Sequence, residues 1–317
     1  MSSRRRQTFS RTRPTTTASG SSSVHPATST STAEFRYTLL DVFTDVALAG
    51  NALAVVHDAD EVDDATMLAF ARETRLSETT FVQSATANGA DYRNRIWTVG
   101  EELPFAGHPS LGTAVAVAFV GGETGEAQYV QQTGAGLQSI EVVLNGGGSA
   151  TAAMVQEPAV FGDELDPAAA LAPLGLGADA AHVLLRPQVV STGLPHLMAP
   201  LRSVRDLARI VPDYEALFAL LEPMGAFGVY AACFDPDSGT ARTRFFARDP
   251  GIAEDPATGS AAGPLCAYLS RHAGCDAVEI MQGLEMGRPS RLLAEVFNDR
   301  VRVSGDVVVV VDGTVRL

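Results

Sequence analysis

Two segments of the chain place glycine turns and polar side chains in the same order. Glu102 to Thr113 reads ELPFAGHPSLGT, and Glu254 to Leu265 reads EDPATGSAAGPL. Both contain the frame Glu-x-Pro-x-x-Gly, and the next position holds His108 in one copy and Ser260 in the other. Each segment follows a strand-like run and precedes a run of small residues typical of a helix. The repetition predicts two related halves that face one cleft.

A turn that enters a helix is suited to bind an anion. Its backbone N–H groups lack partners within the helix, and the helix dipole adds positive charge there. We therefore interpret the turns at Gly107 and Gly259 as binding sites for a carboxylate, although glycine turns of this kind also occur without any ligand. Ser260 is expected to donate a hydrogen bond to the anion. It does not fit the nucleophile elbow Gly-x-Ser-x-Gly, because Thr258 stands where the first glycine belongs.

Glu78 is a candidate acid/base group. It lies in the segment LSETTF, between the apolar residues Leu76 and Phe81. A carboxylate that loses hydration among apolar neighbours has a raised pKa, by up to about 3–5 units when it is fully buried. Such a group can take and return a proton near neutral pH. The same residues also fit a helix-cap motif or a surface turn, and the segment alone leaves both readings open.

Three further polar residues have more than one reading. His108 could act as an acid, donate a hydrogen bond to a substrate, or cap its helix. Asp255 could bind a substrate amine or complement the helix dipole. Arg288 could contact an anion or lie in a surface turn. The sequence lacks HExxH and has no second histidine or acidic residue at metal-ligand spacing, so we expect no metal site.

Composition excludes several classes of protein. The chain has 317 residues, of which 46% are hydrophobic, and a formal net charge of −14. No apolar run approaches the roughly 20 residues of a membrane span, and the acidic charge disfavours nucleic acid and anionic membranes as partners. Three scattered cysteines indicate a reducing compartment, and we expect the cytoplasm. The chain has no lysine, which excludes a pyridoxal-phosphate Schiff base.

Strand patterns outnumber helical ones, and hairpins outnumber βαβ units, which predicts an α+β fold rather than a doubly wound parallel sheet. Residues 1–34 are rich in Ser, Thr and Arg and are expected to form a disordered tail. We predict an N-terminal lobe over residues 35–158 and a C-terminal lobe over residues 159–317. The predicted helices are 64–75, 110–119, 204–210, 213–221 and 261–270. The predicted strands include 37–43, 52–56, 76–82, 92–99, 128–133, 137–144, 151–156, 182–185, 196–199, 228–234 and 240–247.

Taken together, five segments resemble the PhzF family of phenazine biosynthesis isomerases, which has the diaminopimelate-epimerase fold. The resemblance implies two pseudo-symmetric lobes, each a mostly antiparallel sheet wrapped around a central helix, and this agrees with the internal repeat. The segments are DVFTDVALAGNALAVV (41–56), LSETTFV (76–82), ELPFAGHPSLGTA (102–114), GIAEDPATGSAAGPL (251–265) and MQGLEMGRPS (281–290).

The resemblance also implies an active site. In diaminopimelate epimerases a cysteine from each of the two turns transfers the proton. The corresponding positions here look like Ala106 and Thr258, which disfavours a two-thiol racemase. The family pattern instead assigns proton transfer to Glu78. The other residues that it implies are the catalytic His108 and Asp255 and the substrate-binding Gly107, Gly259 and Ser260.

The reaction implied by the resemblance is the isomerisation of trans-2,3-dihydro-3-hydroxyanthranilate. Glu78 would remove the proton at C3 and return one at C1, and no cofactor is needed because the diene of the substrate spreads the charge. The resemblance further implies a small carboxylate as substrate and a homodimer. The alternatives are a related isomerase of another secondary-metabolite pathway, such as alkylproline assembly, a catalytically silent family member, or a serine hydrolase. The last would need a His–Asp pair beside Ser260.

Overall fold

The computed structural model describes residues 33–248 and 254–317, and the statements below concern those residues. The expected tail, 1–34, lies outside the described residues up to position 32, whereas Glu34 already begins the first strand. The strands are β1 (Glu34–Val42), β2 (Asn51–Val56), β3 (Glu78–Gln83), β4 (Tyr92–Trp97), β5 (Glu102–Leu103), β6 (Gly125–Thr133), β7 (Gly136–Gly146), β8 (Ser149–Val155), β9 (Val160–Glu164), β10 (Gln188–Ser191), β11 (Pro195–Pro200), β12 (Gly228–Asp235), β13 (Thr240–Ala247), β14 (Glu254–Asp255), β15 (Ala277–Gln282), β16 (Ser290–Phe297) and β17 (Arg300–Arg316). The helices are α1 (Asp64–Thr74), α2 (Gly107–Gly121), α3 (Pro167–Leu171), α4 (Val204–Ala208), α5 (Tyr214–Leu221) and α6 (Gly259–Ala273).

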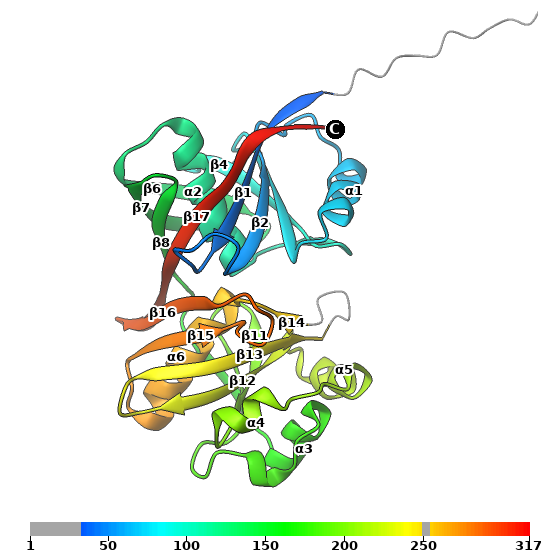
Figure 1. Cartoon of the computed structure of the whole chain (residues 1–317), viewed down its shortest axis with the longest axis vertical. Coiled ribbons are helices and arrows are strands. Elements are labelled where there is room, and N and C mark those ends of the chain that lie inside the picture. The colour runs from blue at the N-terminus through cyan, green and yellow to red at the C-terminus, as the bar shows by residue number, and fades with distance from the viewer. Residues whose placement is uncertain (1–32, 249–253) are drawn as a thin grey trace, which may run out of the picture. The chain divides into compact units, whose positions relative to one another are not determined.

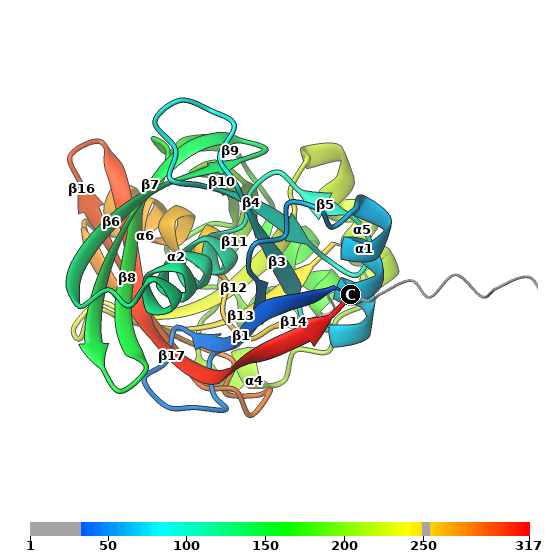
Figure 2. The same cartoon turned by 90° about the horizontal axis from the view of Figure 1, so that it is seen from above.

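The first series of strands closes on itself around a helix. β1 is antiparallel to β2, β2 is parallel to β3, β3 is antiparallel to β4, and β4 is parallel to β6. An antiparallel run of β6, β7 and β8 follows, and β17 then joins β8 to β1. α2 contacts strands all around this ring and lies inside it (Figure 2).

The second series repeats the same pairing. β10 is antiparallel to β11, β11 is parallel to β12, β12 is antiparallel to β13, and β13 is parallel to β15. An antiparallel run of β15, β16 and β17 follows, and α6 packs against these strands as α2 does against the first series. The long strand β17 pairs with members of both series and runs from one to the other in Figure 1.

Burial explains why α2 and α6 are the central helices. The first three turns of both helices are buried on every side and, apart from His108 in α2 and Tyr268 in α6, consist of small and apolar residues, which is the pattern of a helix without a solvent-facing side. Both begin earlier than predicted, at Gly107 and Gly259, and end at the left-handed glycines Gly122 and Gly274. The helices that lie outside the sheets are amphipathic or short: α1 packs against β3 and β4, and α3, α4 and α5 share a second core with β11, β12 and β13.

An arginine holds each of the two repeated turns. Arg95 on β4 donates two hydrogen bonds to the carboxylate of Glu102, one of them 2.8 Å long, and Arg244 on β13 donates two bonds of 2.7 and 2.8 Å to Glu254. Both pairs are bidentate, a geometry that fixes direction as well as distance. The repeated glutamates of the sequence frame therefore anchor the turns to the preceding strand.

The strand predicted over 182–185 is wrong. The ring of His182 accepts hydrogen bonds from the backbone N–H groups of Leu184 and Leu185 through Nδ1, so the chain turns there instead of extending. Val183 and Leu184 consequently point outwards, with 77% and 84% of their surface exposed. The strands β9 and β10 on either side were not predicted.

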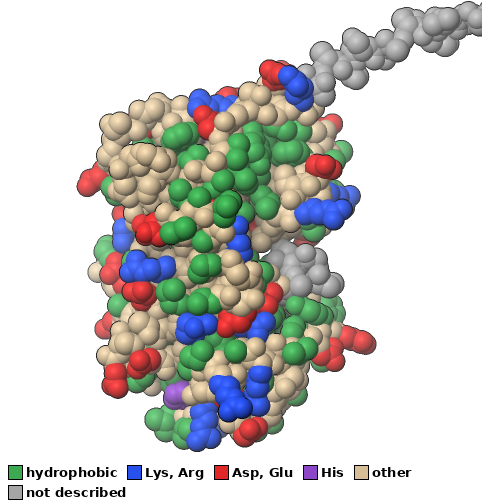
Figure 3. Space-filling view, in the orientation of Figure 1, with side chains coloured by type: hydrophobic (Ala, Val, Ile, Leu, Met, Phe, Trp, Pro, Cys, Tyr) green, Lys and Arg blue, Asp and Glu red, His purple; other side chains and the backbone are tan. Residues whose placement is uncertain are grey.

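The surface carries charges of both signs. On the face shown in Figure 3, arginine and acidic side chains are interspersed. Over the described part of the chain, none of the helices is both long and apolar enough to cross a membrane.

Candidate active site

The two repeated turns lie against each other. A Cβ atom placed on Gly107 would lie 2.8 Å from the backbone nitrogen of Ser260 and 3.0 Å from the carbonyl carbon of Gly259. Only glycine therefore lets the N-termini of α2 and α6 approach this closely. Neither helix is capped by the side chain of its N-cap residue, Ala106 or Thr258. The unpaired N–H groups of two helices thus converge on one place.

Glu78 begins β3 and is buried beside these turns, with 8% of its surface exposed. Burial, and secondly the negative charge of Asp255, raise the pKa of Glu78 well above its ordinary value. Its Oε2 atom lies 3.5 Å from Nε2 of His108 and has no hydrogen-bond partner among the described residues. The buried site therefore favours the protonated form of the carboxyl group, and compensating charge or hydrogen bonds from a ligand would favour its ionisation.

His108 is the second residue of α2 and is also buried. Burial lowers its pKa to about 3, so the ring is neutral. The amide nitrogen of Asn51 lies 3.3 Å from Nδ1, but its two protons have nearer acceptors in Asp255 and the carbonyl group of Ala257, at 2.8 and 3.0 Å. Nε2 of His108 faces the carboxyl group of Glu78, and neither Nε2 nor Oε2 of Glu78 has a hydrogen-bond partner among the described residues.

Asp255 is held by three donors. Asn51 donates to its carboxylate over 2.8 Å, Thr258 over 2.6 Å and Ser77 over 3.2 Å. Burial raises the pKa of Asp255 to about 6, and the hydrogen bonds from these three residues oppose the rise. Glu78 receives no comparable set of donors. Asp255 is consequently the group of the pair that ionises first, and its charge disfavours ionisation of Glu78.

A cavity of about 30 Å³ is lined by these polar groups and by an apolar wall. The polar part of the lining consists of Glu78, His108, Asp255, Thr258 and Ser260, together with the two glycines. The apolar wall consists of Leu103, Phe105, Leu194, Phe227 and Phe245.

Among the described strands, the second series has no carboxyl group at the position equivalent to Glu78. Glu78 opens β3 opposite Leu53 of β2, and Gly228 opens β12 opposite His196 of β11, so the two positions are equivalent in the repeated pairing. A Cβ atom on Gly228 would lie 2.3 Å from the ring of Phe245. An aromatic side chain therefore fills the space in which a second carboxyl group would have to stand.

Ser260 has a histidine neighbour, as a serine hydrolase would require. Its Oγ atom lies 3.2 Å from Nε2 of His196. However, Nδ1 of His196 is buried without a hydrogen-bond partner among the described residues, so the carboxylate that orients the histidine of a catalytic triad is missing there.

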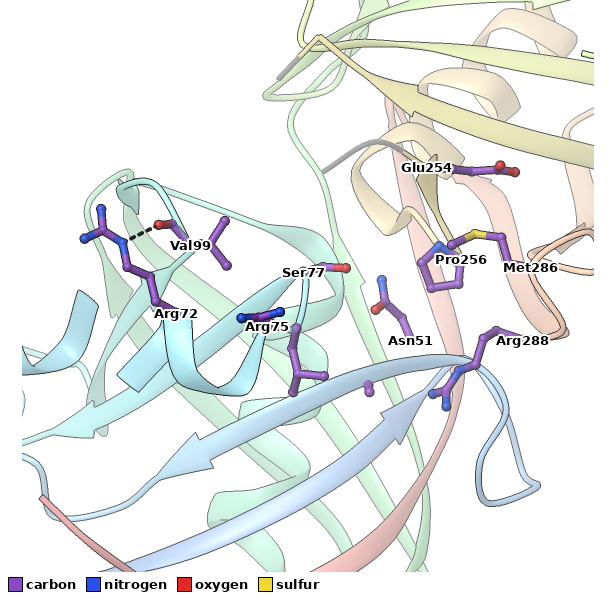
Figure 4. Close-up of a pocket in the computed structure, with 11 residues that line it drawn as sticks. Asn51, Arg72, Arg75, Ser77, Val99, Glu254, Pro256, Met286 and Arg288 are labelled. Carbon is purple, nitrogen blue, oxygen red and sulfur yellow. Dashed lines mark hydrogen bonds between the residues drawn. The ribbon is translucent and has the colours of Figure 1, made fainter. Parts of the chain in front are cut away.

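Arg288 lies outside this cavity. It donates to the carbonyl groups of Ala49 and Gly50 over 2.7 and 2.9 Å and to Asp41 over 2.5 Å, and so fixes the turn before β2. With Arg72, Arg75 and other residues it lines a separate cleft of about 820 Å³, shown in Figure 4. Asn51 and Ser77 line this cleft and also donate to Asp255, so that these contacts separate the cleft from the cavity.

Comparison with known proteins identifies the family. A family model described as phenazine biosynthesis-like protein matches residues 40–313. The chain belongs to this PhzC-PhzF family. The trans-2,3-dihydro-3-hydroxyanthranilate isomerase of Pseudomonas aeruginosa is 37% identical over 272 residues, which cover 85% of this chain and 93% of that protein. The predicted membership of the PhzF family and the isomerase class are thereby confirmed.

Solved structures show the same fold. A predicted epimerase from Pseudomonas aeruginosa matches the PhzF-family chain with a TM-score of 0.79 and 36% identity, covering 89% of this chain and 99% of that one. A hydroxyproline epimerase from Agrobacterium vitis matches with a TM-score of 0.61 over 90% and 93% of the two chains. At 16% identity the second likeness concerns the fold alone. The predicted epimerase-like, sheet-rich α+β fold is confirmed at this level.

The structure brings the predicted residues of the PhzF-family site together and adds others. Each addition contacts a predicted residue from an element distant in sequence, so spacing alone could not reveal it. Asn51, Ser77 and Gln282 lie inside the recognised segments 41–56, 76–82 and 281–290, which was the only signal for them. The added residues are Asn51, Ser77, His196 and Gln282, the last of which donates to the backbone carbonyl of Asp255 over 2.7 Å.

Proposed function

We propose that the chain converts trans-2,3-dihydro-3-hydroxyanthranilate to its amino-oxo-cyclohexene carboxylate tautomer, with Glu78 as the proton-transfer group. The observation that carries this proposal is the carboxyl group of Glu78, which is buried beside the two helix N-termini with its Oε2 atom 3.5 Å from Nε2 of His108. The named activity of the relative from Pseudomonas aeruginosa supports the choice of substrate. Burial of Glu78 within 3.5 Å of His108 favours an active enzyme over a silent family member.

The carboxylate of the substrate is proposed to bind where α2 and α6 meet. The backbone N–H groups of Gly107 and Gly259 and the hydroxyl of Ser260 supply donors there, and the two helix dipoles favour a negative charge. The ring then faces the apolar wall that contains Phe227 and Phe245. Such an arrangement fits a small cyclic acid with polar groups on one side.

The proton transfer is proposed to need one base. An ionised Glu78 removes the hydrogen at C3, the diene shifts, and the protonated Glu78 gives a proton to C1. The resulting enol then becomes the ketone, so that the product is an isomer of the substrate. Gly228 stands at the position equivalent to Glu78, which supports a single carboxyl group that acts first as base and then as acid.

Substrate binding itself is proposed to activate the base. In the empty site the charge of Asp255 opposes ionisation of Glu78. An ammonium group of the substrate placed beside Asp255 would offset that charge, and the N–H of His108 would stabilise the carboxylate. The cavity of about 30 Å³ is small for a six-membered ring, so the lining side chains are proposed to move as the ring enters.

The deciding experiment compares the wild type with Glu78→Gln in D₂O, with the dihydro-hydroxyanthranilate as substrate. We expect the wild type to form the ketone with deuterium at C1, and the folded variant to form none above the uncatalysed rate. Product formation by the variant at a rate near that of the wild type would remove Glu78 from the mechanism. The conservative variant Glu78→Asp tests placement, because it keeps the acid and shortens its reach.

We further propose that residues 35–158 and 159–317 form two pseudo-symmetric lobes, which β17 joins by returning to the first series. The identical order and direction of strand pairing around α2 and α6 supports this division. A cytoplasmic homodimer is retained as a proposal, and light scattering after size-exclusion chromatography measures the oligomeric state.

A further inference from the structure

His196 is a buried histidine that the proposed proton transfer does not use. It lies in β11 and is fully buried. Its ring meets those of Phe227 and Phe245 nearly at right angles, at centroid distances of 6.0 and 5.3 Å. Both phenylalanines and Ser260 line the cavity, and Nε2 of His196 lies 3.2 Å from the hydroxyl oxygen of Ser260. His196 therefore contacts Ser260 from behind the wall that the substrate would meet.

The surroundings of His196 determine which ring nitrogen carries the proton. Burial lowers the pKa of His196 to about 3, so the ring is neutral and has a single N–H. Nδ1 has no hydrogen-bond partner among the described residues. A proton on Nδ1 would leave a buried donor unpaired, which folded proteins rarely allow, whereas a proton on Nε2 leaves only a lone pair unpaired. The ring consequently donates from Nε2 to Ser260.

The direction of this hydrogen bond decides what the serine can do. A hydroxyl oxygen that accepts from His196 keeps its own proton for another acceptor. Ser260 is the second residue of α6 and lines the cavity, and the hydrogen bond that its side chain makes within the described residues is the one to His196. Its proton is thus available to a ligand at the start of the helix.

We propose that His196 is a positioning residue that holds Ser260 as a hydrogen-bond donor to a carboxylate oxygen of the substrate. The proposal rests on the proposed role of Ser260 in substrate binding. It also separates Ser260 from a serine nucleophile, which needs a histidine that accepts its proton.

The tautomer can be measured directly in the wild-type protein. The ¹⁵N chemical shifts and ¹H–¹⁵N couplings of the six histidines report which ring nitrogen is protonated, and the signal absent from His196→Gln assigns this ring. We expect a proton on Nε2 and a neutral ring down to pH 5. A proton on Nδ1 would overturn the proposal, because Ser260 would then be the donor to histidine.

The energetic link is tested by a double-mutant cycle that uses anthranilate, a flat amino acid, as a calorimetric probe of binding. Ser260→Ala and His196→Leu are each expected to weaken binding by about tenfold, the effect of losing one hydrogen bond to a charged group. The double variant should bind no more weakly than Ser260→Ala. An equal further loss in the double variant would show that His196 acts through packing alone and would overturn the proposal.

His196→Gln is the matched control, because its amide can place an N–H near the position of Nε2. We expect this variant to bind within about threefold of the wild type, and binding as weak as that of His196→Leu contradicts the proposal. If His196→Leu does not fold, the measured tautomer of His196 and the binding affinity of His196→Gln still test the proposal. If the isomerase assay fails but the double-mutant cycle gives the expected binding losses, the proposed function is refuted and the inference about His196 stands. If the isomerase assay succeeds but the double-mutant cycle does not give these losses, the inference is refuted and the proposed function stands.

Discussion

Replacing Glu78 with glutamine is expected to stabilise the fold while it abolishes activity. Burial raises the pKa of Glu78 in the folded protein, whereas a glutamate in the unfolded chain titrates near 4.3. The contribution of this carboxyl group to stability is therefore fully present below about pH 4.3. It is lost progressively as the pH rises through the folded pKa, because the buried site disfavours the charge that the unfolded chain accepts.

The magnitude follows from proton linkage. Between the unfolded and the folded pKa of Glu78, the wild type loses about 1.4 kcal/mol of unfolding free energy per pH unit relative to a variant that cannot ionise. Glu78→Gln keeps the shape of the side chain and carries no charge. The difference in stability between variant and wild type should thus grow with pH from about pH 5 and become constant above the folded pKa.

Urea unfolding in half-unit steps from pH 5 to 9 measures this difference, with fluorescence of the buried Trp97 as the signal. His57, whose lowered pKa comes mainly from burial and has no contribution from Glu78, titrates alike in both proteins and cancels in the difference. Glu73→Gln, at an exposed position of α1, is the matched control for the chemical change itself, because it makes the same substitution outside the buried site. A flat difference for Glu78→Gln would mean that Glu78 ionises as freely as in the unfolded chain, and the reasoning about a poised base would be refuted.

Two further predictions concern the surroundings of the base. Asp255→Asn removes the negative charge that, together with burial, raises the pKa of Glu78, so the acidic limb of the pH profile of kcat/KM should move to lower pH. The value of kcat should fall because contacts to the substrate are lost. An acidic limb that stays in place would contradict the coupling between Asp255 and Glu78. Gly107→Ala would force a Cβ atom to within 2.8 Å of the backbone of Ser260, which should cost about 1–3 kcal/mol of stability and reduce kcat/KM at least tenfold. Gly121→Ala at the other end of α2 meets its nearest neighbour only at 3.8 Å and should retain full activity, and equal losses in both variants would contradict the role of the abutting turns.

The local sequence determined the parts of the site that depend on neighbouring residues. The repeated Glu-x-Pro-x-x-Gly frame predicted two strand-to-helix turns, because glycine and proline punctuate a chain through their own backbone preferences. The apolar neighbours of Glu78 indicated a raised pKa for this carboxyl group, because they remove it from water and are close to it in the sequence. Over 182–185 the local pattern misled, because the ring of His182 accepts hydrogen bonds from two backbone N–H groups and the chain turns there, which no periodicity reveals.

Only the tertiary structure decided which side chains meet. Asn51 donates to Asp255 from 204 positions away, Ser77 does so from 178, and His196 contacts Ser260 across 64. These contacts arise because two series of strands with the same pairing order bring the starts of α2 and α6 together. A buried polar group depends for its pKa and its direction of hydrogen bonding on whatever partners the fold supplies, and strand pairing at such separations is not encoded in the spacing of residues along the chain.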